Sequence, residues 1–183
     1  MRRRSATCGP IALSSGRHLG PARRHRCSRR HRKARRRGPN IETVSLGDFV
    51  AQHAITGVHL LKVDTDGLDL AIIRSGLDWI AEQRPVLFFE YFEIDLRANG
   101  DDGLSTLQEL RRVGYDVILY YDNLGRFLCA TSLANEAQLR QLYAYIAGGR
   151  GAFPYYDLCV FHSRDADLAA HVIEQEERFF ASR

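Results

Sequence analysis

The clearest hydrophobic pattern in the chain lies between residues 58 and 90. Residues 58–63 (VHLLKV) and 86–89 (VLFF) are short and almost continuously apolar, and apolar side chains recur at helical spacing between Leu70 and Ile80. Continuous apolar runs are typical of parallel strands that are covered on both faces. A helix that joins two such strands forms a right-handed crossover. The pattern therefore predicts a strand, one helix and a second strand parallel to the first.

Further elements are predicted before and after this unit. Ser45 and Asp48 have the spacing of a capping box, which predicts a short helix that ends near Gly57. Residues 93–103 are polar and predict a loop. The other predicted elements, in chain order, are a helix over 104–113, a strand over 117–121, a turn at 122–125, a returning strand over 126–131, a helix over 139–146, a strand over 155–162 and a helix over 168–180. This order predicts a doubly wound α/β fold whose sheet ends in an antiparallel hairpin.

The charge of the chain divides into two opposite segments. Residues 1–40 contain 13 arginines, one lysine and no acidic residue, whereas residues 41–183 contain the other 12 basic residues and all 22 acidic ones. The basic segment has few large apolar side chains, so burial cannot offset the entropy cost of ordering it. We expect a disordered arginine-rich tail over 1–40 and a folded domain over 41–183 that is long enough to bury a core.

Cysteine usage and hydropathy indicate a cytoplasmic protein without a membrane partner. Cys129 and Cys159 lie in apolar runs and no CxxC pair occurs, which is typical of core cysteines in a reducing compartment. No apolar stretch reaches the ~18 residues that a membrane span needs. The first arginines are not followed by an apolar segment long enough for an export signal. His59, inside an apolar strand, is expected to be a core histidine.

Three aspartates, Asp64, Asp66 and Asp69, follow the first predicted strand. Open α/β sheets bind ligands at the carboxyl ends of their strands, so a reaction is expected at this segment. A carboxylate at the end of a buried strand is costly without a partner, and Lys62, two residues back on the same face, is the nearest cation. Asp66 and Asp69 also fit a structural role, because carboxylates stabilise the amino end of a helix.

Two metal-dependent functions fit this motif poorly. A phosphatase of the haloacid dehalogenase type uses the first aspartate of Asp-x-Asp-Gly as its nucleophile. It also needs an acidic pair after a later strand, and Asp101 and Asp102 lie in a loop before a helix. A glycosyltransferase with an Asp-x-Asp metal site needs a nucleotide pocket, and too few ordered residues are expected before the motif. No histidine has a partner at metal-ligand spacing, so no metal is expected.

A third interpretation covers most of the domain. The stretches TVSLGDFVAQ, HLLKVDTDGLDLAIIRSGL, RPVLFFEY, GYDVILYYDNLGRFL and YYDLCVFHSRDADL follow one another in the chain. Together they resemble, over residues 43–164, the carboxyl half of the FkbM-type methyltransferase family. Members of that family carry Lys-x-Asp-x-[Glu/Asp]-Gly where residues 62–67 stand here, and a carboxylate closes the next strand where Glu90 stands.

The resemblance implies a Rossmann-like methyltransferase fold. It also implies transfer of a methyl group from S-adenosylmethionine to a hydroxyl oxygen of a small molecule or glycan. Such a site aligns the acceptor oxygen, accepts its proton and excludes water. The implied site residues are of two kinds: for catalysis Asp64, Asp66 and Glu90, and for substrate binding Lys62, Asp69 and Tyr91.

The amino half of that fold, which holds most of the cofactor, has no recognisable counterpart in the sequence. It requires a glycine-rich turn after a first strand and an acidic residue at the end of a second, and residues 1–40 contain neither pattern. The expectation is a sheet truncated at its amino side, with no assignable cofactor-binding residue and with little or no activity. In the family's sheet order the strand at 58–64 is central. One of its edges is therefore expected to be unpaired here and to favour self-association.

The arginine-rich segment has two further interpretations. An arm with 14 positive charges is expected to bind nucleic acid through phosphate contacts that weaken with salt. A non-catalytic remnant domain with such an arm is the alternative function. The abrupt change of composition at residue 40 also fits DNA that is translated in the wrong frame and joined to the second half of a gene.

Overall fold

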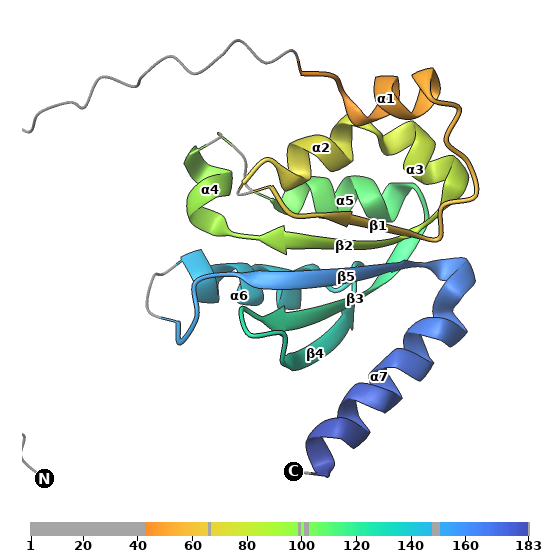
Figure 1. Ribbon diagram of the computed structural model, residues 1–183. Helices are drawn as coiled ribbons and strands as arrows, with labels where there is room; N and C mark the ends of the chain where they lie inside the picture. Colours follow the sequence, from red (N-terminus) through yellow and green to blue (C-terminus); the bar gives the residue numbers. More distant parts are fainter. Residues whose placement is uncertain (1–42, 66, 99, 101–102, 148–150, 183) are drawn as a thin grey trace, which may run out of the picture. The chain divides into compact units, whose positions relative to one another are not determined.

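The computed structural model describes residues 43–65, 67–98, 100, 103–147 and 151–182. The chain divides into two units, Met1–Asn40 and Ile41–Arg183. The expectations for residues 1–40 lie outside the described residues, and the description below concerns the second unit (Figure 1). Its elements, in chain order, are α1 (Leu46–Gln52), β1 (Leu60–Val63), α2 (Asp69–Ser75), α3 (Leu77–Gln83), β2 (Val86–Tyr91), α4 (Glu93–Ala98), α5 (Leu104–Arg112), β3 (Tyr115–Asp122), β4 (Phe127–Ser132), α6 (Glu136–Ala147), β5 (Tyr156–His162), the 3-10 turn η1 (Ser163–Asp165) and α7 (Ala166–Ala181).

The predicted crossover is present at the start of the domain. β1 and β2 pair in parallel, with Val63 opposite Phe89. The prediction of one connecting helix is wrong, because the segment is split at Gly76 into α2 and α3. A Cβ atom on Gly76 would lie 2.7 Å from the Leu46 side chain of α1. The close approach of α1 therefore requires glycine at this position, and the chain leaves helical geometry there.

Most of the other predicted elements are confirmed, although α1 ends at Gln52 rather than near Gly57. Ser45 caps α1 by accepting a hydrogen bond from the Asp48 amide at 3.0 Å. In the turn between β3 and β4 the Asp122 carboxylate accepts hydrogen bonds from two backbone amides of residues 124 and 126. The predicted loop over 93–103 is wrong in part, because it contains α4. Leu96 of α4 is buried in the main core, so tertiary packing, rather than a long helical pattern, stabilises this short helix.

The five strands form one sheet in the order β1-β2-β5-β3-β4. β5 runs antiparallel to both of its neighbours, β2 and β3, and β4 returns antiparallel to β3. β1, β2 and β3 therefore end on the same side of the sheet, where β5 begins. Figure 1 shows the arrowheads of β1 and β2 on the side where α4 lies. We call this side the carboxyl end of the sheet; it comprises residues 62–65, 89–92, 121–122 and 155–157.

Helices pack on both faces of the sheet, but β1 is less buried than expected. Leu70 of α2 and Leu107 of α5 belong to the larger core on one face. On the other face α7 packs against β3, β4 and β5, with Ala169 fully buried. Leu60 is 59% exposed and His59 is also exposed. The expected core histidine is therefore wrong, because β1 is an edge strand within the described residues.

The two cysteines of the sheet have a packing role. Cys129 of β4 and Cys159 of β5 are free and half-buried. Burial raises the pKa of both thiols, to about 12 for Cys159, so they stay protonated and unreactive. In the part of the chain that the structure describes, no helix is both long enough and apolar enough to span a bilayer.

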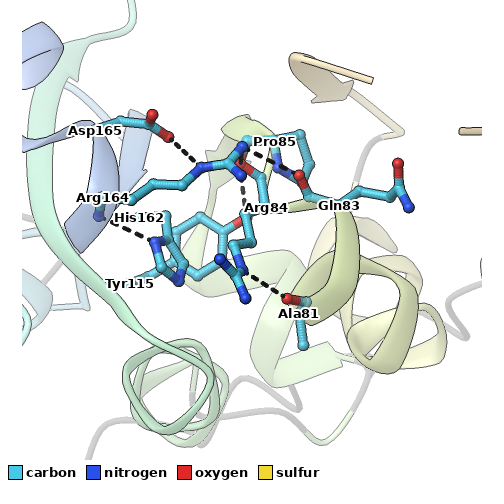
Figure 2. Close-up of polar contacts among 8 residues, drawn as sticks. All are labelled: Ala81, Gln83, Arg84, Pro85, Tyr115, His162, Arg164 and Asp165. Carbon is cyan, nitrogen blue, oxygen red and sulfur yellow. Dashed lines mark hydrogen bonds and ion pairs between the residues drawn. The ribbon is translucent and has the colours of Figure 1, made fainter. Parts of the chain in front are cut away.

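Polar contacts join three segments at the end of the sheet opposite the carboxyl end (Figure 2). The Tyr115 hydroxyl donates to the carbonyl oxygen of Pro85 at 2.6 Å. The Arg164 guanidinium donates to the carbonyl oxygens of Gln83 and Arg84 at 3.2 and 3.1 Å. These bonds tie the turn between α3 and β2 to the first residue of β3 and to η1. They therefore hold the start of β2 against β3 and η1.

Candidate active site

Acidic side chains from three strands converge at the carboxyl end of the sheet. Asp64 directly follows β1, Glu90 lies near the end of β2 and Asp157 lies near the start of β5. Glu90 and Asp157 are register partners, and side chains at such positions have Cβ atoms about 5 Å apart. The charge of Asp64 also acts on Asp157. The structure thus brings together two predicted site residues and one that was not predicted.

Asp157 is the candidate that the sequence analysis missed. Burial raises the pKa of its carboxyl group, and the charge of Asp64 raises it further, while Lys62 opposes this effect. A carboxylate with a raised pKa is a stronger proton acceptor than an ordinary one. Its signal in the sequence is an acidic residue inside the apolar run YYDLCVF. Its position opposite Glu90, however, depends on the antiparallel pairing of β5 with β2.

Two aromatic rings lie beside these carboxylates. Burial raises the pKa of the Tyr155 hydroxyl, and the charges of the three carboxylates raise it further. The ring centroids of Tyr155 and Phe92 are 5.8 Å apart. Carboxylates accept hydrogen bonds from hydroxyl groups, and aromatic rings bury large apolar areas. Such a cluster has the chemistry to bind a ligand that carries hydroxyl groups and an apolar face.

The predicted ion pair between Lys62 and Asp64 is confirmed. The Lys62 ammonium nitrogen lies 3.0 Å from a carboxylate oxygen of Asp64, and this contact raises the pKa of Lys62. The two side chains are 58% and 57% exposed, so water screens the pair and it contributes little stability. The expected desolvation of Asp64 is therefore wrong, because the edge position of β1 leaves the end of this strand open to solvent.

Asp69 is the buried carboxylate of the predicted motif. It begins α2 and is 1% exposed. One of its oxygens, Oδ2, accepts hydrogen bonds from the Thr65 hydroxyl at 3.2 Å and from the Gly67 amide at 3.3 Å. The other oxygen, Oδ1, is buried and has no hydrogen-bond partner among the described residues. Asp69 therefore shapes the loop between β1 and α2, while Asp66, in the same loop, lies outside the described residues.

Tyr91 is placed away from the acidic cluster. Its side chain is buried in the larger core, where its ring lies 6.2 Å from that of Tyr143. Glu90, the preceding residue of β2, points to the opposite face because side chains alternate along a strand. The structure does not bring Tyr91 together with the three carboxylates, and its role in substrate binding stays a prediction.

Two hollows of the described surface lie away from the acidic cluster. One of ≈ 480 Å³ is lined by α1 and α3 and includes Trp79, and another of ≈ 580 Å³ runs along α7 and includes Phe179. Neither is lined by the acidic cluster. Among the described residues, no group of three or more histidine, cysteine or acidic side chains has the geometry to hold a metal ion.

Comparison with known proteins identifies the family. The sequence model of the methyltransferase FkbM domain matches residues 5–117. The match contains β1, β2 and the aspartate motif, and it begins earlier and ends earlier than the 43–164 range of the resemblance. No curated protein and no solved structure matches the chain. Because the match spans more than half of the chain, the protein belongs to the methyltransferase FkbM domain family, which indicates methyltransferase activity.

Proposed function

We propose that the chain is an S-adenosylmethionine-dependent O-methyltransferase whose acceptor binds at the carboxyl end of the sheet. The observation that supports the proposal is the convergence of Asp64, Glu90 and Asp157 at this end, in a chain of the FkbM family. The acceptor class is a small molecule or a glycan with a free hydroxyl group. The neighbouring aromatic pair, Tyr155 and Phe92, favours an acceptor that also has an apolar face.

The chemistry of methyl transfer explains why carboxylates are needed. The acceptor oxygen attacks a methyl carbon in line with the bond that breaks, and its proton must pass to a base. The methyl group is supplied by the cofactor. We assign the base to the group formed by Asp64, Asp66 and Glu90, and we add Asp157 because its raised pKa suits a proton acceptor. Lys62, Asp69 and Tyr91 remain the proposed substrate-binding residues.

The proposal for the cofactor is more restricted. In a Rossmann-like sheet the cofactor is held mainly by strands on the amino side, and β1 is one of the two edge strands of the described sheet. We therefore propose a sheet truncated at its amino side, and a chain that binds the cofactor weakly and has low activity or none by itself. The free cysteines are consistent with a reducing compartment such as the cytoplasm.

Two measurements test these statements separately. Calorimetric titration of the full chain with S-adenosylmethionine is expected to give at most millimolar affinity, and micromolar binding would refute the truncated sheet. Ligand-observed NMR at millimolar cofactor should still detect binding that S-adenosylhomocysteine displaces, and its absence would refute the methyltransferase itself. If turnover is measurable with a hydroxyl acceptor, Asp64→Asn should abolish it. The matched variant Asp167→Asn, at an exposed position of α7, should not.

A basic nucleic-acid-binding arm is the second proposal. It is supported by the 13 arginines of residues 1–40, which lie outside the described residues. Binding of a short DNA duplex should be weak at physiological salt and should strengthen steeply at lower salt. A chain that starts at residue 41 should lose this binding. Equal binding by both chains would refute the arm.

A further inference from the structure

The side of β1 that faces away from β2 runs up to the candidate active site. Within the described residues β1 pairs with β2 alone, in a continuous parallel register from Leu60 to Val63. Its other side therefore presents backbone amide and carbonyl groups to which no described strand is bonded. Such a row of groups is a template for another strand.

β1 is short, with four residues, but other usual protections of an edge strand are weak here. The segment Leu60–Thr65 contains no proline, and the pairing of Leu60–Val63 with β2 has no bulge. A lysine is the common device that keeps edges apart, but the charge of Lys62 is neutralised by Asp64 at 3.0 Å. The exposed side chain of Leu60 adds apolar surface next to this edge.

The charges of this strand select one partner and one register. If a second copy of β1 pairs antiparallel about a two-fold axis at Val63, Lys62 of each copy lies directly opposite Asp64 of the other. An axis at Lys62 would instead oppose two lysines, and an axis at Asp64 would oppose two aspartates. Opposite charges across an antiparallel pair stabilise it and like charges destabilise it. The strand is therefore complementary to itself in the register centred on Val63.

The same register continues the faces of the sheet across the axis. Val63 is buried on the face that carries the larger core. Lys62 projects from the other face, because side chains alternate along a strand. Asp64, directly after β1, lies on the same side as Lys62, because its carboxylate is 3.0 Å from the Lys62 ammonium nitrogen. Half-buried Phe88, the β2 neighbour of Lys62, lies on this second face. In the paired dimer, the core face of one copy therefore continues the core face of the other, and the face with Lys62 and Asp64 continues its counterpart. An isologous interface requires this arrangement.

We propose that the chain forms a homodimer in which β1 of each copy pairs antiparallel across a two-fold axis at Val63, with two reciprocal contacts between Lys62 and Asp64. The inference does not require that the chain catalyses methyl transfer, although its contacts use two residues of the candidate active site. The interface is short, so the dimer is expected to dissociate on dilution. It also places Lys62 of the partner copy beside Asp64 at the candidate active site.

Charge-swapped variants of the full chain test the register. Sedimentation velocity over a concentration series should show a reversible dimer for the unmodified chain. Lys62→Glu alone and Asp64→Lys alone each place like charges opposite one another twice, and each should raise the dimer dissociation constant at least roughly tenfold. An equimolar mixture of the two variants should dimerise again, because position 62 of each copy then meets an opposite charge at position 64 of the other. Neither variant has the ion pair within its own chain, so recovery in the mixture isolates the contact between copies.

Controls exclude a general effect of charge. The ion pair between Glu136 and Arg140 on α6 is comparably exposed, and Arg140→Glu should leave the dimer unchanged. Circular dichroism should show the same helix content for every variant. A chain that stays monomeric at all concentrations overturns the proposal. It is also overturned by single variants that dimerise like the unmodified chain, or by a mixture that dimerises no better than its components.

Discussion

Tyr115→Phe tests how much a buried contact of Figure 2, at the end of the sheet opposite the carboxyl end, stabilises the domain. The Tyr115 side chain is 1% exposed and its hydroxyl donates to the Pro85 carbonyl at 2.6 Å. Phenylalanine has nearly the same shape, so the substitution removes this hydrogen bond without leaving a large cavity. The Pro85 oxygen then loses its donor in a buried position that water does not reach easily.

The expected cost follows from this burial. A buried acceptor that loses its partner costs about 1–3 kcal/mol, whereas an average hydrogen bond contributes about 1 kcal/mol. For a folded domain of this size, such a loss lowers the melting temperature by roughly 3–10 °C. The edge-on contact between Tyr115 and His162, with ring centroids 5.4 Å apart, is retained in the variant, so the loss reports the hydroxyl group.

Urea unfolding followed by circular dichroism measures the effect. The midpoint should fall while the slope stays constant, since the area exposed on unfolding is unchanged. Tyr145→Phe is the matched control, because the Tyr145 hydroxyl accepts a hydrogen bond from the Ala152 amide at 2.9 Å but the residue is 44% exposed. Water replaces that bond, so the control should lose less than about 0.5 kcal/mol. Equal losses in the two variants, or no loss in Tyr115→Phe, would refute the assigned role of the buried bond.

Three further predictions concern other parts of the domain. The pKa of His162 is lowered from 6.5 by burial and by two neighbouring arginines. The stability that neutral His162 contributes should therefore be fully present above pH 6.5 and should be lost as the pH falls through the lowered pKa. His162→Gln should reduce the fall of the urea midpoint between about pH 7.5 and about pH 5. The pKa of Asp157 is raised, so its ionisation destabilises the fold above that pKa, and Asp157→Asn should raise the melting temperature at about pH 7 more than at about pH 4. Gly76→Ala should cost about 1–3 kcal/mol through its contact with Leu46, and adding Leu46→Ala should cost less than the sum of the two single changes.

The local elements of the domain were mostly predictable. The apolar runs of β1 and β2, the cap at Ser45 and the turn at residues 122–125 are each encoded within a few residues, because hydrophobic period and turn chemistry act locally. The break at Gly76 was not predictable, since its cause is the approach of Leu46 from a helix 30 residues earlier. α4 was missed for a related reason, because its stability depends on burial of Leu96 rather than on its own pattern.

The candidate site also combines features that are predictable from the sequence with features that only tertiary packing decides. The sequence by itself determined the parallel crossover, the position of Asp64 and Glu90 at strand ends, the ion pair of Asp64 with Lys62 and the resemblance to the FkbM family. Only the tertiary structure decided that β5 lies between β2 and β3, and this insertion places Asp157 opposite Glu90 and brings Tyr155 to the same end. The physical reason is that a strand's own sequence fixes which faces it buries, whereas its neighbour in the sheet is selected by packing between segments about 70 residues apart.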